Sequence, residues 1–138
     1  MKLLTILAFL AFIFPFGCVD YSNFTAPAGT FQYSAYDNAM NLVAYGWLTI
    51  NDKDSSDIVG DWKIAAVGDV AHLGPQIGDG KSHGSFQKSK LYLNLNPTVV
   101  DDNVILVGSY DGRTFKGNWG WSSFAGLTDK GFFVAVRK

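Results

Sequence analysis

Beyond residue 30, apolar and polar side chains alternate along much of the chain with a period of two. In one such run, three leucines alternate with polar or half-polar residues (Leu91, Leu93 and Leu95 against Tyr92, Asn94 and Asn96). Successive side chains of a β-strand point to opposite faces, so this period is typical of a strand with one face on a core. No window supplies an amphipathic helical face of useful length. The alternation therefore predicts an all-β protein.

The alternating runs are short and are separated by turn-forming residues. We expect strands at residues 43–50, 58–66, 91–96, 104–110, 115–122 and 131–137, with shorter strands at 31–36 and 85–87. Asp111-Gly112 lies between two of these runs and is a strong hairpin signal. Short strands joined in sequence by tight turns predict one antiparallel, up-and-down meander of seven or eight strands.

Glycines inside the expected strands favour a closed barrel over an open sandwich. Gly46, Gly60, Gly108 and Gly117 each fall at a strand position. Glycine at such a position marks sharp coiling of the strand or close packing under a large ring. A strongly coiled sheet that closes on itself also removes the exposed edges at which sheets aggregate. We therefore expect a small β-barrel, and 138 residues allow one such domain.

The composition agrees with this fold and excludes one class of partner. All 12 acidic residues are aspartates, and Asp favours turns where Glu favours helices. The net charge of −1 lacks the basic surface of a nucleic-acid-binding protein, so we expect no nucleic-acid partner. The single cysteine, Cys18, excludes a disulfide within the chain.

The N-terminal segment has the pattern of an export signal. Lys2 is followed by a run of 14 residues, from Leu3 to Phe16, that are all apolar except Thr5. This run is shorter than the ~20 residues of a membrane-spanning helix and has the length of a signal-peptide core. We therefore expect an exported protein whose residues 1–17 are removed.

The lone cysteine follows this run directly. Gly17-Cys18 and the polar residues after it resemble a bacterial lipoprotein signal, although Pro15 and Phe16 depart from that family's preferred residues. The resemblance implies that Cys18 is lipidated and anchors the protein to a membrane of the cell envelope. Residues 18–30 would then be the lipidated cysteine and a tether, and residues 31–138 the barrel. The alternative is an ordinary secretory signal and a secreted protein.

Three segments of the expected barrel resemble the calycin-like barrels, such as lipocalins and avidins. They are Gly60-Asp61-Trp62, Gly117-Asn118-Trp119 and the terminal run 131–137. Lipocalins place Gly-x-Trp on their first strand, whereas here a hairpin precedes it. The resemblance implies a small barrel, with Arg137 bracing Trp62, and does not indicate a specific ligand.

Aromatic side chains are the candidate ligand contacts of such a barrel. We take Trp47, Trp62, Trp119, Trp121 and Tyr110 as candidates to line a cavity, with simple core packing as the alternative. An interior of about eight strands is just wide enough for side chains or one small ligand. The glycine-rich segment 68–84, which contains His72 and His83, is longer than the usual hairpin loop, and we expect it to form a lid.

No motif indicates catalysis. Residues 80–84 (Gly-Lys-Ser-His-Gly) match the Gly-x-Ser-x-Gly nucleophile motif, but that motif needs a strand-to-helix turn that this chain does not offer. We therefore expect no catalytic residue, no metal and no cofactor. The leading hypothesis is a non-enzymatic envelope lipoprotein that binds a small apolar or aromatic ligand or a protein partner. The alternatives are an interaction protein similar to a periplasmic hydrolase inhibitor, with a filled barrel, and a small barrel enzyme that uses His72 and His83.

Overall fold

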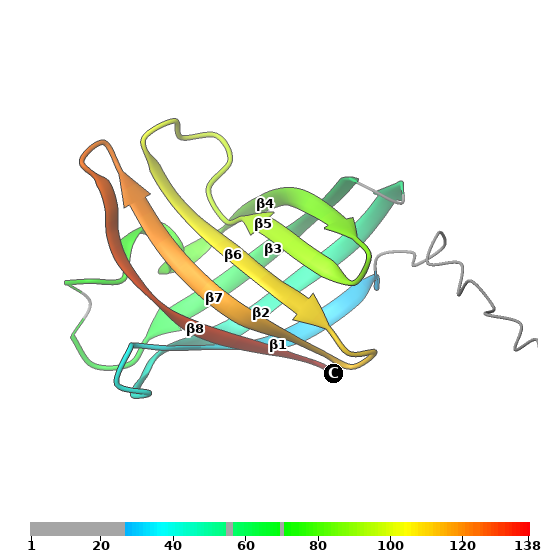
Figure 1. The fold of residues 1–138 in the computed structure, drawn as a ribbon, viewed down its shortest axis with the longest axis horizontal. Coiled ribbons are helices and arrows are strands. Elements are labelled where there is room, and N and C mark those ends of the chain that lie inside the picture. The colour runs from blue at the N-terminus through cyan, green and yellow to red at the C-terminus, as the bar shows by residue number, and fades with distance from the viewer. Residues whose placement is uncertain (1–26, 55–56, 70) are drawn as a thin grey trace, which may run out of the picture.

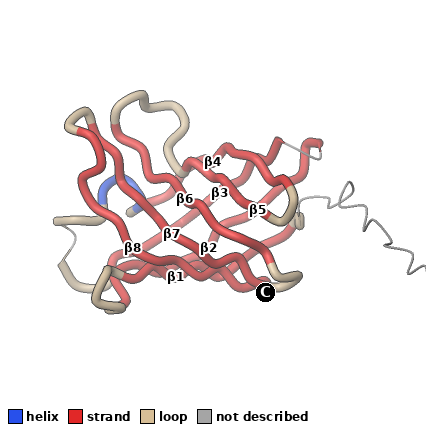
Figure 2. Tube along the Cα trace, viewed as in Figure 1, coloured by secondary structure: helices blue, strands red, loops and turns tan. Residues whose placement is uncertain are grey.

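The computed structural model describes residues 27–54, 57–69 and 71–138. The expected export signal and Cys18 lie outside the described residues. The chain forms eight strands and one short 3-10 turn (Figure 1; Figure 2): β1 (Gly29–Tyr36), β2 (Leu42–Asp54), β3 (Asp57–Ala66), η1 (Gly74–Gln76), β4 (Gly78–Gln87), β5 (Lys90–Asn94), β6 (Asp102–Tyr110), β7 (Thr114–Ser123) and β8 (Gly126–Arg137). None of the described residues belongs to a helix that could cross a membrane.

The strands form a closed antiparallel barrel in which each strand pairs with its neighbours in sequence. β1 and β8 complete the closure, with Phe31 opposite Arg137 and Tyr36 opposite Phe132. The alternation in the sequence therefore predicted the fold class correctly. The expected hairpin at Asp111-Gly112 joins β6 to β7, and the Asp111 carboxylate accepts the backbone N–H groups of Arg113 and Thr114.

Side chains fill the interior of the barrel. Alternate residues of each strand point inward and are buried, as in the pattern of Ile58, Trp62 and Ile64 along β3. The largest of these buried side chains are aromatic: Phe31, Tyr33, Phe86, Phe115, Trp119 and Phe133. An eight-stranded barrel has room for little more than such a core.

Close approach of backbones explains the glycines within the strands. A Cβ atom on Gly60 would overlap the carbonyl oxygen of Thr49, and one on Gly84 would overlap that of Tyr92. A Cβ on Gly80 would lie 2.9 Å from the indole of Trp62. The barrel can therefore coil this tightly only where these side chains are missing.

One part of the predicted lid is a strand instead. Residues 78–84, expected in a loop, form most of β4 and pair with β3. Because Gly80 and Gly84 make room for the Trp62 ring and for β5, the inward face of residues 78–84 lacks the large apolar side chains that mark a strand in the sequence, and only Phe86, near the end of β4, supplies one. His83 consequently lies in β4 and not in a lid. The connection before β4, which carries His72, does cover one end of the barrel.

The two ends of the barrel differ. The β1–β2, β3–β4, β5–β6 and β7–β8 connections lie at one end, here named the loop end, toward the left in Figure 1. The three remaining turns and the start of β1 lie at the opposite end, here named the tether end. At the tether end the Arg137 guanidinium lies over the Phe31 ring, 5.6 Å from its centroid. The expectation that Arg137 braces Trp62 was therefore wrong.

Candidate functional site

Two of the five candidate ligand residues belong to the packed core. Trp62 and Trp119 are 4% and 2% exposed. The Trp62 indole N–H donates to the carbonyl oxygen of Leu95 (2.7 Å), and that of Trp119 donates to the carbonyl oxygen of Tyr36 (2.9 Å). Both tryptophans thus fill the barrel and hold adjacent segments together, which is the packing alternative for these residues.

Two further candidates close the ends of the core. At the loop end, the Trp121 indole N–H donates to the Asp102 carboxylate (2.6 Å), and the ring packs against Gly74 of η1. At the tether end, the Tyr110 ring packs against that of Phe115 in a tilted arrangement, with ring centroids 4.5 Å apart. Both rings are partly buried and pack against the core.

The connection before β4 is packed into the loop end. Leu73 and Gln76 are buried there, and the Gln76 amide donates to the Leu73 carbonyl oxygen (2.9 Å). The Tyr33 hydroxyl lies 3.2 Å from the Gln76 side-chain oxygen, to which it donates. Complete burial raises the pKa of Tyr33 far above its usual value. This connection therefore closes the loop end of the barrel, and the buried Gln76 side chain is hydrogen-bonded through both its oxygen and its nitrogen. We refer to residues 73–76 as the loop-end plug.

The fifth candidate, Trp47, lies on the outside of the barrel. Its neighbours along β2, Leu48 and Ala44, point inward, whereas Trp47 is half-buried on the outer face. Hollows of about 540, 300 and 290 Å³ border this ring on different sides. The largest is also lined by Asp61, Trp62, Lys63, Asp79, Gly80 and Lys81. We refer to this region of β2–β4 as the outer-face hollow.

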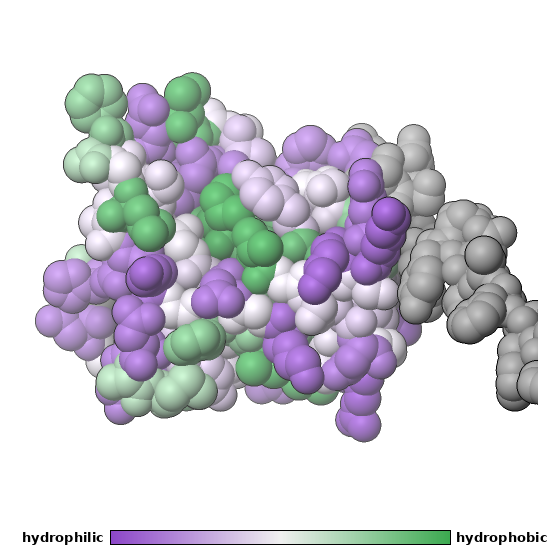
Figure 3. Space-filling view, viewed as in Figure 1, coloured by the Kyte–Doolittle hydropathy of each residue, from purple (hydrophilic) through white to green (hydrophobic). Residues whose placement is uncertain are grey.

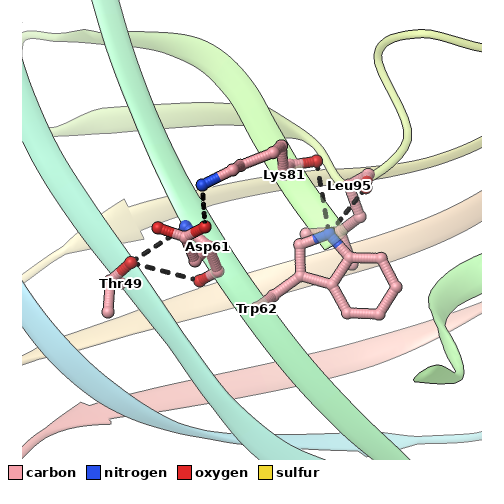
Figure 4. A network of polar contacts seen from close by, with 5 residues as sticks. All are labelled: Thr49, Asp61, Trp62, Lys81 and Leu95. Atoms are coloured by element: carbon pink, nitrogen blue, oxygen red, sulfur yellow. Dashed lines mark hydrogen bonds and ion pairs between the residues drawn. The ribbon is translucent and has the colours of Figure 1, made fainter. Parts of the chain in front are cut away.

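A small polar network fixes the wall of the outer-face hollow (Figure 4). The Thr49 hydroxyl accepts the Asp61 backbone N–H (2.9 Å) and donates to the Asp61 carbonyl oxygen (3.2 Å). The Asp61 carboxylate forms an ion pair with the Lys81 ammonium on β4. These contacts connect β2, β3 and β4, and they hold charged side chains at the rim where solvent reaches them.

The two histidines occupy separate places. His83 on β4 is 2.6 Å from the Asp57 carboxylate, and His72 before η1 is 3.7 Å from that of Asp129. The Ser82 hydroxyl is buried and has no hydrogen-bond partner among the described residues. The described residues hold no group of three His, Cys, Asp or Glu side chains arranged for a metal ion.

Exposed apolar side chains gather at the loop end. Phe124 is 91% exposed and Val100 is 87% exposed, each on a different connection. Further large apolar side chains on or beside the loop-end connections are at least 40% exposed: Met40, Leu42, Val67, Val99 and Leu127. The space-filling view shows green, apolar areas toward the left, where the loop end lies, and also in the middle of the face shown (Figure 3). The described residues of the tether-end turns contribute none of the strongly exposed large apolar side chains.

Searches of protein-family models, curated proteins and solved structures find no match to this chain. The structure is a closed eight-stranded barrel, which is compatible with the calycin-like architecture.

Sequence reasoning missed the surfaces that the fold creates. Asp61, Lys63, Asp79 and Lys81 come together only because β3 and β4 pair, with Lys63 opposite Asp79 and Asp61 opposite Lys81. The loop-end apolar residues are scattered in sequence, and each alone is an ordinary surface residue. The predicted meander could have revealed the loop-end cluster, since alternate connections of a meander lie at the same end of the barrel.

Proposed function

We propose that this chain is a non-enzymatic, lipid-anchored binding protein of a bacterial cell envelope, and that it binds a protein partner at its loop end. The observation that carries this proposal is the concentration of exposed apolar side chains there, led by Phe124 and Val100. Large exposed apolar groups clustered on one surface are typical of interaction sites. The filled interior supports the hypothesis of an interaction protein over that of a ligand enclosed in a calycin-like barrel.

The arrangement of the ends suits an anchored binding protein. The chain enters β1 at the tether end, so an anchor on Cys18 would leave the loop end directed away from the membrane. Asp37, Asp69, Asp101 and Asp129 lie on or beside the loop-end connections. These carboxylates would favour a partner with basic residues around an apolar pocket.

The separate histidine sites support a role in binding over catalysis. His72 and His83 each face a single carboxylate and belong to different segments, so they do not form an acid–base pair. The buried Ser82 hydroxyl has no neighbouring base in the hydrogen bonds of the described residues.

The anchor is tested by labelling producing cells with a radioactive fatty acid. We expect label on the wild-type protein and none on Cys18→Ala. Equal labelling of the two proteins, or no label on either, would show that Cys18 does not carry the anchor.

The partner site is tested by photo-crosslinking in the same cells. A photoreactive residue at position 124 should give a discrete crosslinked protein, whereas one at Tyr92, on the outer face of β5, should not. The crosslink should be lost when Val100→Asp is added, because a buried, unpaired carboxylate opposes docking. If the crosslink persists with Val100→Asp, or position 92 gives the same product, the loop end is not the binding surface.

A further inference from the structure

Trp47 differs from the other three tryptophans in the hydrogen bonding of its indole N–H. Trp62, Trp119 and Trp121 each donate the ring N–H to an acceptor in the protein. Trp47 has no hydrogen-bond partner among the described residues, and it lies half-buried on the outer face. A buried tryptophan usually finds a partner for its N–H, whereas a half-buried one such as Trp47 can leave its N–H to solvent. The Trp47 ring and its N–H are therefore both available to a ligand.

The charges around this ring cancel. Two carboxylates and two ammonium groups line the largest hollow beside Trp47: Asp61, Asp79, Lys63 and Lys81. Asp61 and Lys81 form an ion pair across β3 and β4, whereas Lys63 and Asp79 lie opposite each other without one. An anion or a cation would meet as much like charge as opposite charge here. A neutral ligand with hydroxyl groups can donate to Asp79 and accept from Lys63.

The shape of the hollow also selects the class of ligand. It is open to solvent, so a purely apolar molecule would keep much of its surface in water and would place charged groups against hydrocarbon. A ligand with one apolar face and a polar rim avoids both costs. The pyranose ring of a sugar has this form, since its axial C–H groups make an apolar face and its equatorial hydroxyls make the rim.

We propose that the outer-face hollow is a binding site for a neutral oligosaccharide. One sugar ring stacks on the Trp47 indole, and its hydroxyls bond to Asp79 and Lys63. The hollows on the other sides of Trp47, bordered by Tyr45 and by Thr30 with Lys138, extend the site to neighbouring sugar units. This site is separate from the partner surface at the loop end, and neither proposal depends on the other.

Calorimetric titration with defined oligosaccharides tests the site. The full chain is purified in a zwitterionic detergent, because detergents with sugar headgroups would occupy the hollow. Cellohexaose, maltohexaose and chitohexaose are the probes. We expect at least one of them to bind, with a dissociation constant between the micromolar and millimolar ranges.

The variants distinguish stacking from non-specific adsorption. Trp47→Ala should weaken binding by about tenfold or more, and Trp47→Phe, which keeps a ring but loses the N–H, should weaken it less. Asp79→Asn and Lys63→Met should each weaken binding by about threefold or more. Tyr92→Ala, an exposed aromatic on β5, is the matched control and should leave binding unchanged. Thermal unfolding followed by circular dichroism establishes that each variant is folded.

Three results would overturn the proposal. The first is no heat of binding with any of the three probes at concentrations on the order of 10 mM. The second is binding that both Trp47 variants leave at the wild-type level. The third is equal loss of binding in folded Tyr92→Ala and Trp47→Ala.

Discussion

The hydrogen bond between Tyr33 and Gln76 allows a quantitative test of what holds the loop-end plug (residues 73–76) in the barrel. Both side chains are completely buried, and the Tyr33 hydroxyl donates to the Gln76 oxygen across 3.2 Å. Tyr33→Phe keeps the ring but leaves that oxygen without a donor. Leaving a buried polar group unsatisfied costs about 1–3 kcal/mol, so we expect the free energy of unfolding to fall by that amount.

Gln76→Leu should lower the free energy of unfolding by more than Tyr33→Phe does. It leaves the buried Tyr33 hydroxyl without its partner and removes the side-chain hydrogen bond to the Leu73 carbonyl oxygen, which together correspond to about 2–4 kcal/mol. In the double variant, the two introduced apolar side chains can contact each other, and only the side-chain hydrogen bond to the Leu73 oxygen is lost. The double variant should therefore be more stable than the sum of the single losses predicts, by about 1–2 kcal/mol.

Urea unfolding followed by tryptophan fluorescence measures all four proteins. The dependence of the free energy on urea concentration should be the same in each, because the surface exposed on unfolding hardly changes. If the two single losses add to within about 0.5 kcal/mol of the double loss, the side chains are not coupled. The loop-end plug would then not be held in place by this hydrogen bond.

Two further predictions concern the loop end of the barrel, the first with a control glycine, Gly112, in the β6–β7 turn at the tether end. Gly74→Ala should destabilise the protein by about 2–3 kcal/mol in urea, because φ is +60° and a Cβ would lie 2.5 Å from the Trp121 ring. Gly112→Ala, at φ +100° with no atom within 4 Å, should cost about 1 kcal/mol through backbone strain alone, and equal losses would argue against the overlap. Stability should also fall above about pH 10, where Tyr33 ionises in the unfolded chain but stays protonated in the fold, since burial raises its folded pKa. Tyr33→Phe should flatten this alkaline decline, and an unchanged slope would contradict the assignment.

The sequence predicted the barrel because its dominant signal, the period of two, reports directly on which side chains face a core. It failed at β4 for a related physical reason. Over residues 78–84 the inward positions of that strand are Gly80, Ser82 and Gly84, since Trp62 and a neighbouring backbone occupy the space that larger side chains would take. The first large inward side chain is Phe86, near the end of the strand, so residues 78–84 show no apolar alternation in the sequence.

The position of Trp47 could not be read from β2 alone. Along residues 43–50 both faces of the strand are largely apolar, so alternation does not say which face turns inward. The register with β3 decides it, because Trp47 lies opposite the exposed Lys63 and Leu48 lies opposite the buried Trp62. Only the cross-strand partners, which sequence periodicity does not reveal, show that Trp47 lies on the outer face whereas Trp62 and Trp119 lie in the core.

The placement of β1 also determines how the barrel responds to mechanical load. β1 is hydrogen-bonded along its length to both β2 and β8, and the chain enters it at the end opposite the loop-end connections. A pull between the N-terminal segment and a partner at the loop end would run along the strands, perpendicular to their hydrogen bonds. Both ladders of β1 would then have to shear together, whereas a pull across the sheet would unzip them one bond at a time. The barrel should therefore resist tension applied between the proposed N-terminal anchor and the proposed partner at its loop end.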